Sequence, residues 1–409
     1  MKRSGIIFLI TGILLSACQK QSGEGYTLKF YGDAKTDIGY SVAIASDGYL
    51  IAGQLDLINR SSVTETSDNI DMAVIKTDWE GNIKWPPVTA GGRYDDYGSK
   101  LLQLSDGSMI CIGTLTDTIS PLKKKQVYAI KLSSTGSVIW KKAYSGGSYN
   151  QEGKDIIETG FGFIILGSTD APNSSGGDYT GNIAGNTDLL VIRIDPNGNF
   201  ISSDPAGFAG NEEPSAIVKN GEGDFVLLGT TDRAIDQTMQ LNNIFLVKLF
   251  SNGALGPYRI FGTSLEERPA GLLALNDGYL VAGTTGVLAK EKEAFVEKLP
   301  LAIFNDTIGK IFRRDFRIND KPTTVNCIAR SPGGNYLLGG CVYADPGLRM
   351  TVFEIGSDGL PVEGKLIIKG SSGDQVVNDV VEGDDGYIIA VGSNSSDANS
   401  MISFLKFKF

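Results

Sequence analysis

The sequence contains no histidine, and this absence removes several large classes of active site. Catalytic systems of the Ser-His-Asp and Cys-His kinds need an imidazole as the base. Zinc, copper and non-haem iron sites with histidine ligands are excluded for the same reason. The G-x-x-x-x-G-K-[ST] motif that cradles phosphates is missing too. Any catalysis would therefore rest on carboxylates, lysine, tyrosine or a hard cation, and a glycosidase with paired carboxylates is the most reasonable class.

Positive charge and proline are also scarce. The 409 residues carry a net charge of −10, with 14 prolines against 52 glycines. Basic residues are scattered along the chain, whereas phosphate binding needs a basic face, so no nucleic-acid partner is expected. No stretch shows a sustained helical period of apolar residues. The many glycines and a hydrophobic content of 41% indicate short strands and tight turns around a large core, so we predict an all-β fold.

The first 17 residues are predicted to be a signal peptide. Lys2 and Arg3 precede an apolar run of about 11 residues, Gly5 to Leu15, which is typical of such peptides. As a helix this run would be about 16 Å long, too short for a hydrocarbon core of about 30 Å. The string LSAC ends at Cys18 and resembles the lipobox of bacterial lipoproteins, which implies cleavage before Cys18 and its lipidation. An ordinary secretory signal with a chance cysteine is the alternative.

The predicted organisation is a signal peptide at 1–17, a lipidated cysteine and tether at 18–25, and one folded domain at 26–409. By resemblance, Gln19 is compatible with sorting to an outer membrane, on its periplasmic or cell-surface face. Of the three remaining cysteines, Cys327 and Cys341 are expected nearly opposite each other on one hairpin. They would form either a disulfide or two small buried apolar positions.

One cassette recurs seven times in the predicted domain: an apolar strand, a turn with glycine, and a second strand that ends in glycine. SDGYLIAG from Ser46 and NDGYLVAG from Asn276 are two copies. Such a turn between apolar runs is a strong hairpin signal, because a two-residue type I′ turn needs a positive φ that glycine adopts freely. The turn glycines are Gly48, Gly107, Gly162, Gly223, Gly278, Gly334 and Gly386.

A second hairpin follows each cassette at least in part, so each unit holds four strands, A to D. Four strands in a unit of about 40 to 60 residues are typical of propeller blades, and we predict a seven-bladed β-propeller. The chain ends on MISFLKFKF, which aligns as strand C, while Tyr26 to Tyr31 resembles strand D. We therefore predict that the N-terminal strand completes the last blade, which removes the open edges of the ring.

The repeat resembles the β-propeller repeats of surface proteins and lipoproteins of Bacteroidota. The closest copy spans residues 146–199 and contains GGDYTGNIAGNTDLLVIRIDPNGN. The resemblance covers nearly the whole mature chain and implies a surface or outer-membrane lipoprotein with seven propeller repeats. Blades 5 and 6 depart from the pattern around Pro300, which leaves their strand limits open.

The D–A and B–C connections of a propeller share one face, the top face. Long B–C connections at 54–70 and 168–187 predict an asymmetric site built mainly by blades 1 to 4. Acidic residues recur in the D–A connections: Asp37, Asp96, Glu152, Glu212, Glu267 and Asp374. Two interpretations stay open. The carboxylates form a ring at the mouth of the channel for a cation or a positively charged ligand, or they cap turns by accepting backbone N–H groups.

Aromatic residues flank the same connections and are candidate platforms for a sugar or a peptide, or covers for the bases of the loops. They are Tyr94, Tyr97, Tyr149, Tyr179 and Phe208. Residues 170–188 are rich in Asp, Asn, Gly and Ser and could hold calcium, although they lack the spacing of an EF-hand loop. No other cofactor is expected.

Together these features predict a lipid-anchored module of an outer membrane that is not an enzyme. The expected role is an accessory lipoprotein that binds or assembles with an outer-membrane protein, because the tether of 18–25 is short. A glycan- or peptide-binding surface protein of a nutrient-uptake system is the first alternative. A carboxylate-based glycosidase or lyase is the second.

Overall fold

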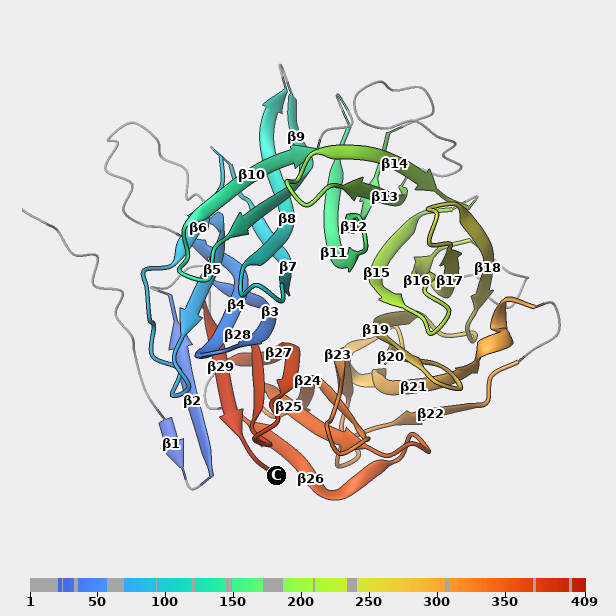
Figure 1. The fold of residues 1–409 in the computed structure, drawn as a ribbon. Coiled ribbons are helices and arrows are strands. Elements are labelled where there is room, and N and C mark those ends of the chain that lie inside the picture. The colour runs from blue at the N-terminus through green and yellow to red at the C-terminus, as the bar shows by residue number, and fades with distance from the viewer. Residues whose placement is uncertain are drawn as a thin grey trace, which may run out of the picture.

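The computed structural model describes residues 21–409 apart from 24, 33–35, 57–69, 93, 120–121, 145–146, 148, 172–186, 209, 234–240, 306–308, 371–372 and 397–398. Seven antiparallel sheets stand around a central axis like the blades of a propeller (Figure 1). The predicted all-β, seven-bladed fold is confirmed. The predicted signal peptide and Cys18 lie outside the described residues.

The strands of each blade run in order from the innermost, A, to the outermost, D. Blade 1 has β3 (Ile38–Ala45), β4 (Gly48–Asp56), β5 (Ile70–Thr77) and β6 (Val88–Ala90). Blade 2 has β7 (Tyr97–Gln103), β8 (Met109–Ile119), β9 (Leu122–Leu132) and β10 (Val138–Tyr144). Blade 3 has β11 (Gln151–Thr159), β12 (Gly162–Thr169), β13 (Asp188–Ile194) and β14 (Phe200–Ala206). Blade 4 has β15 (Glu212–Lys219), β16 (Phe225–Thr231), β17 (Asn243–Leu249) and β18 (Leu255–Phe261).

The remaining blades follow the same order. Blade 5 has β19 (Glu267–Leu275), β20 (Gly278–Thr285), β21 (Glu293–Pro300) and β22 (Phe312–Phe316), with the short 3-10 helices η1 (Ala289–Glu291) and η2 (Leu301–Phe304) in its connections. Blade 6 has β23 (Thr323–Arg330), β24 (Tyr336–Ala344), β25 (Gly347–Ile355) and β26 (Pro361–Lys369). Blade 7 has β27 (Asp374–Glu382), β28 (Ile388–Ser396), β29 (Asn399–Phe407), β2 (Tyr26–Tyr31) and a fifth, outer strand β1 (Gln21–Gly23).

The seven A–B turns depend on their glycines, as predicted. All seven turn glycines adopt a positive φ, from 75° at Gly386 to 157° at Gly278. At Gly48 a side chain is also excluded for lack of space, because a Cβ atom would lie 1.9 Å from the carbonyl oxygen of Thr77. The recurring glycine therefore serves the backbone conformation in all seven turns, and at Gly48, Gly162 and Gly278 it also allows the close approach of strand C.

The hydrophobic core lies between the blades. Seven clusters of buried apolar side chains occur, and each is shared by two neighbouring blades. Strands B and C have apolar residues on both faces, as in Tyr49–Ala52 and Leu189–Ile192, because each sheet is sandwiched between two others. Every blade thus needs both of its neighbours to bury its apolar faces.

The ring closes where the two ends of the domain meet in blade 7. Strand β2 pairs antiparallel with β29, from Tyr26 opposite Phe407 to Tyr31 opposite Ile402. Leu28 and Phe30 pack in the cluster shared with blade 6, while Tyr31 packs in the cluster shared with blade 1. The predicted closure by the N-terminal strand is confirmed.

The cysteines differ from the expectation. Cys341 pairs with Thr324 and Cys327 pairs with Gly339, so the two are not opposite each other. Both are buried and free, as is Cys111. Their role is therefore that of small apolar side chains. Over the described ranges, no helix is long and apolar enough to cross a membrane.

We predict that Leu28→Ala lowers the free energy of unfolding by about 2–5 kcal/mol, because it leaves a cavity in the cluster that β2 shares with blade 6. Chemical denaturation measures the loss. The matched control is Thr27→Ala on the same strand, which is half-buried and should cost less than about 1 kcal/mol. Equal stability of the two variants would show that the strand does not hold the ring.

Candidate functional site

A buried polar side chain begins each innermost strand. The seven residues are Asp37, Asp96, Gln151, Glu212, Glu267, Thr323 and Gln375, and all are 0% exposed. Asp96 and Glu212 illustrate how these side chains are satisfied. Each carboxylate accepts hydrogen bonds from groups in the adjoining segments. Asp96 accepts the N–H groups of Gly92 and Thr116, and Glu212 accepts the N–H of Phe208 and the hydroxyl of Thr231.

These contacts decide between the two interpretations of the recurring acids. Asp37, Asp96, Glu212 and Glu267 are shielded from solvent and bonded inside their own connections. The expected ring of carboxylates open to the mouth of the channel is therefore not formed. The acids instead satisfy backbone donors that would otherwise be buried without a partner, which is the capping role.

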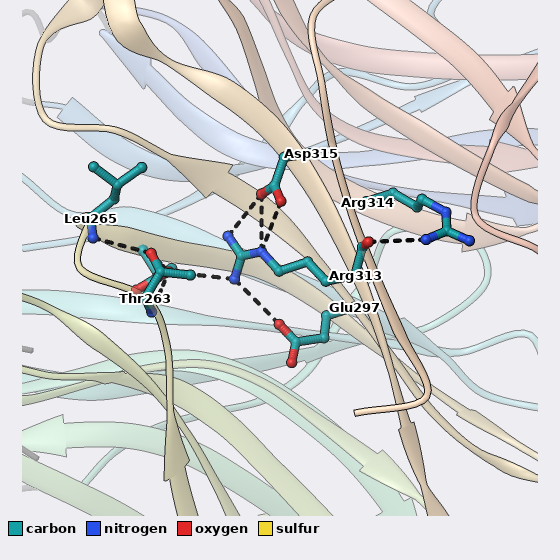
Figure 2. A network of polar contacts seen from close by, with 7 residues as sticks. Thr263, Leu265, Glu297, Arg313, Arg314 and Asp315 are labelled. Carbon is teal, nitrogen blue, oxygen red and sulfur yellow. Dashed lines mark hydrogen bonds and ion pairs between the residues drawn. The ribbon is translucent and has the colours of Figure 1, made fainter. Parts of the chain in front are cut away.

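Glu267 shows how far such a cap can be reinforced, because it adjoins the network of Arg313 with Glu297 and Asp315 that Figure 2 shows. Its Oε1 accepts the N–H and the hydroxyl of Thr263 at 2.9 and 2.6 Å and lies 3.4 Å from Arg313. The buried guanidinium of Arg313 also contacts Glu297 at 3.3 Å and Asp315 at 2.9 Å. Burial raises the pKa of Glu267 above its ordinary value, and Arg313 opposes that shift. This network ties β19, β21 and β22 together.

The residues that line the channel lie three positions after each cap, where every innermost strand has a β-bulge. A bulge inserts one residue and shifts the alternation of side chains by one. The inserted residue therefore lines the channel cavity instead of the blade interface. The seven are Tyr40, Ser99, Lys154, Ser215, Ala270, Asn326 and Asn378.

The channel is asymmetric in polarity. A cavity of about 370 Å³ occupies its interior. Blades 7, 1, 2 and 3 bring long polar or charged side chains to it, whereas Ser215, Ala270 and Gly271 of blades 4 and 5 are small. Its deeper wall also contains apolar residues such as Ile157 and Leu272. The side of the channel that can recognise polar groups is therefore the one formed by the early blades and blade 7.

Lys100 and Asp379 meet inside the channel although they come from blades 2 and 7. The Nζ atom of Lys100 lies 3.4 Å from Oδ2 of Asp379, and the charge of Asp379 raises the pKa of Lys100. The same oxygen accepts the N–H of Val42 and the hydroxyl of Ser41 of blade 1, both at 3.0 Å. Asp379 therefore latches blade 7 to blade 1 and holds Lys100 across the cavity.

Asp155 forms the corresponding latch between blades 3 and 4. Its Oδ2 accepts the N–H of Ile217 at 2.9 Å, and its Oδ1 accepts the N–H of Ile156 at 2.8 Å. Burial raises the pKa of Asp155, and the charge of Lys100 opposes the shift. Asp155, Asp379, Lys100 and Lys154 are thus the charged groups that line the inner cavity.

A second cavity, of about 520 Å³, opens above the first at the mouth of the channel. Tyr40, Tyr97, Asn326 and Asn378 are among its lining residues. The amide groups of Asn326 and Asn378 donate to the carbonyl oxygens of Val377 and Gly39 on the next blade, at 2.8 and 2.9 Å. These bonds fix the orientation of both amides before any ligand arrives.

Glu152 stands between this mouth cavity and an outer cavity of about 260 Å³ over blades 2 and 3. Its carboxylate accepts hydrogen bonds from Lys125 at 2.6 Å and from Lys154 at 3.0 Å. Lys125 lines the outer cavity, and Lys154 lines the mouth cavity. Burial alone would raise the pKa of Glu152, but Lys154 and Lys125 outweigh it and lower the pKa to about 2. Glu152 is therefore ionised at physiological pH and is unsuited to act as a general acid.

The other expected residues are dispersed. Tyr97 lines the mouth, but Phe208 is buried and packs against Phe245 and Tyr258, at ring-centroid distances of 5.8 and 4.5 Å. Tyr94 and Tyr149 are half-buried in their connections. Asp374 is exposed and caps the N–H of Leu348.

Two expected residues, Cys18 and Tyr179, lie outside the described part of the chain. Most of the segment 170–188 lies there too. Over the described ranges, no group of three or more His, Cys, Asp or Glu residues is placed to hold a metal ion.

Sequence reasoning missed the channel residues, although a signal for them exists. They lie three and four positions after each cap, so an alignment of the seven units brings them into two columns. The second column contains Ser41, Lys100, Asp155, Ala216, Gly271, Cys327 and Asp379. Variation within a column is what distinguishes these positions from the caps. Lys125 lies on β9 of the long hairpin with β8.

Comparison with known proteins supports the fold alone. No protein-family model matches the chain, and no curated protein matches it in sequence. A protein of unknown function from Dyadobacter fermentans is similar in structure, with a TM-score of 0.52 and 12% identity over 94% of this chain and 98% of that one. Raptor of Chaetomium thermophilum has a TM-score of 0.53 and 8% identity, and the match spans 91% of this chain but only 28% of Raptor.

The prediction that the chain is not an enzyme needs correction. Solved structures similar to it include the GH93 α-L-arabinofuranosidase of Fusarium graminearum in complex with arabinobiose, with a TM-score of 0.47 and 10% identity over 91% of this chain and 93% of that one. A family-43 glycoside hydrolase is similar over 66% of this chain, with a TM-score of 0.38. These distant likenesses transfer no activity to this chain.

The contacts of Asp379 with blade 1 predict a loss of folding stability when its carboxylate is removed. We expect Asp379→Ala to lower the free energy of unfolding by about 2–3 kcal/mol, because the N–H of Val42 and the hydroxyl of Ser41 lose their partly buried charged acceptor. Asp374→Ala on the same strand is the control and should cost about 1 kcal/mol or less, since Asp374 is exposed and caps one N–H. Denaturant titration of both variants measures the difference. Similar losses for the two would contradict the latch.

Proposed function

We propose that this chain is a glycan-binding propeller of the cell envelope whose site is the mouth of the channel. The observation that carries the proposal is the lining of the mouth cavity. Two tyrosines, Tyr40 and Tyr97, provide flat apolar rings with hydroxyl groups, and two amides, Asn326 and Asn378, are already oriented by the neighbouring blade. Flat rings beside fixed polar groups suit a ligand that has both C–H faces and many hydroxyls.

The adjoining outer cavity supports a ligand longer than one sugar unit. Glu152 and its lysines form a low partition between the two cavities, and Lys125 lies 6.0 Å from the centre of the Tyr97 ring. A linear glycan that enters the mouth can continue over this partition toward blade 3. The partition also offers a fixed carboxylate and two ammonium groups as hydrogen-bond partners to its hydroxyls.

We expect gluco-, xylo-, manno- or arabino-oligosaccharides to bind the purified domain in a calorimetric titration. Tyr97→Ala should lower the affinity at least about tenfold, because it removes a ring from the mouth. Ser215→Ala is the control: it alters the bulge position of blade 4, which lines the inner cavity and not the mouth cavity, and should leave the affinity within about twofold. Absence of binding to every oligosaccharide would contradict the proposal.

Hydrolysis of the bound glycan is a second candidate function, favoured by the two aspartates of the inner cavity. Asp155 has a raised pKa, while Asp379 contacts the ammonium of Lys100, so the two carboxyl groups have different environments. Such a difference is what an acid and a carboxylate partner need in a glycosidase. Release of reducing ends tests it, with Asp155→Asn expected to abolish turnover and thermal melting used to check that the variant is folded.

The envelope location is part of the proposal and rests on Cys18. With β1 beginning at Gln21, two residues separate Cys18 from the sheet, so a lipid on Cys18 would hold blade 7 close to a membrane. A membrane-protein partner, such as a transporter of the bound glycan, fits this position. Co-purification of a stoichiometric partner in mild detergent supports that role, and a solitary monomer argues against it.

We expect the full-length protein to partition with membranes and to incorporate labelled fatty acid when expressed in a bacterium. The Cys18→Ser variant should incorporate none and should appear in the soluble fraction, because the acyl chains supply the membrane affinity. Equal membrane partition of both proteins would contradict lipidation at Cys18.

A further inference from the structure

Two carboxyl groups meet at the junction of blades 3 and 4, next to the outer cavity. Asp188 begins β13 and Glu212 begins β15, and both are fully buried. A Cβ atom on Gly207 would lie 1.3 Å from Oδ1 of Asp188 and 3.0 Å from Oε2 of Glu212. The carboxyl groups of the two side chains therefore converge over Gly207.

Two donors of the neighbouring segments face Glu212. Phe208 donates its N–H to Oε2 of Glu212 at 2.9 Å, and Thr231 of β16 donates its hydroxyl to Oε1 at 2.6 Å. Two charged residues follow Thr231. The carboxylate of Asp232 accepts hydrogen bonds from the backbone N–H and the side-chain amide of Asn211, and the backbone N–H of Arg233 donates to the hydroxyl of Thr231. Two carboxylates in contact at a buried site cannot both be ionised without a large penalty.

The electrostatics agree with the geometry. Burial raises the pKa of Glu212 to about 7, and the charge of Asp188 contributes in the same direction. The acid thus exchanges its proton close to neutral pH, where an exposed glutamate would be fully ionised.

The other blades provide an internal comparison. At the junction of blades 1 and 2 the equivalent positions are also two acids, Asp71 and Asp96, which converge over Gly91. The pair at the junction of blades 2 and 3 is Gln126 and Gln151, and the pair at the junction of blades 4 and 5 is Asn243 and Glu267. An amide provides its own N–H donor, so a pair that contains one can bond at any pH. Two acids at the same positions need a proton for the same bond.

The pair is directly connected to the candidate site. The backbone N–H of Glu212 donates to the carbonyl oxygen of Thr187 at 2.8 Å, and Thr187 lines the outer cavity immediately before Asp188. The backbone of Glu212 is thus hydrogen-bonded to the wall of that cavity.

We propose that Asp188 and Glu212 share one proton, and that loss of this proton at alkaline pH loosens the junction of blades 3 and 4 and weakens binding in the outer cavity. The first half of the proposal is independent of the function proposed above, and the second half rests on it.

The direction of the pH dependence follows from linkage. The folded protein holds a proton that the unfolded chain releases near the ordinary pKa of glutamate, about 4.3. The folded state therefore binds more protons than the unfolded state between about pH 4 and pH 7, and this pair's contribution to stability falls as pH rises through 7.

Thermal melting from pH 5 to pH 9 tests the shared proton. The melting temperature of Glu212→Gln should be close to that of the wild type at pH 5 and about 2–4 °C higher at pH 8, because glutamine donates without a titrating proton. Glu158→Gln on β11, an exposed position, is the control and should show a constant difference from the wild type. A constant difference for Glu212→Gln as well would overturn the proposal.

Two further measurements separate the parts of the proposal. The infrared band of a protonated carboxyl group should be present at pH 6 in the wild type and reduced in Glu212→Gln, and its absence from the wild type would overturn the shared proton. Wild-type affinity for a bound oligosaccharide should fall at least threefold from pH 6 to pH 8, while that of Glu212→Gln should not. If binding is independent of pH, only the coupling between the shared proton and the outer cavity is overturned. If no oligosaccharide binds, the proposed glycan-binding function is overturned, but the conclusion from thermal melting is unaffected.

Discussion

The pairing of β2 with β29 is the interaction on which the rest of the propeller depends. It joins residues from the two ends of the domain through six opposed pairs, Tyr26 with Phe407 to Tyr31 with Ile402. The core consists of seven clusters, each shared by two blades, so no blade buries its apolar faces alone. If β2 were to detach, the clusters on both sides of blade 7 would lose members and the ring would have a free edge. Closure is therefore a condition for stability in every blade.

Closure also explains the distribution of polar groups. Each blade must be joined to the next at its inner edge, where the strands converge and the apolar clusters end. Side chains at and just after the bulges make these joints, as Asp379 does for Val42 and Asn326 does for Val377. The same residues line the channel. A side chain that joins two blades is already rigid, and this is the property that a binding site needs.

The pKa values of the buried caps and of Glu152 are shifted in opposite directions, because their surroundings differ. The caps are sealed from solvent, so burial raises the pKa of Asp96 to about 6 and that of Glu212 to about 7. Glu152 lies between two lysines, and its pKa is lowered to about 2. Proton exchange near neutral pH therefore belongs to the blade junctions, while the partition beside the mouth keeps its charges. Binding and any catalysis at the channel would operate on a framework whose own stability varies with pH.

The sequence by itself determined the number of blades, their turns and the closure of the ring. These features follow from local patterns, because Gly48 and its six counterparts must adopt a positive φ and the missing strand D of blade 7 could be seen from where the repeats end. Only the tertiary structure decided which polar side chains reach the channel. A bulge shifts the alternation of side chains by one residue, so counting from Asp37 or Asp96 gives the wrong face for the residues beyond it. The tertiary structure also brings together partners that are far apart in the sequence. Lys100 and Asp379 are 279 positions apart and meet because the ring is closed.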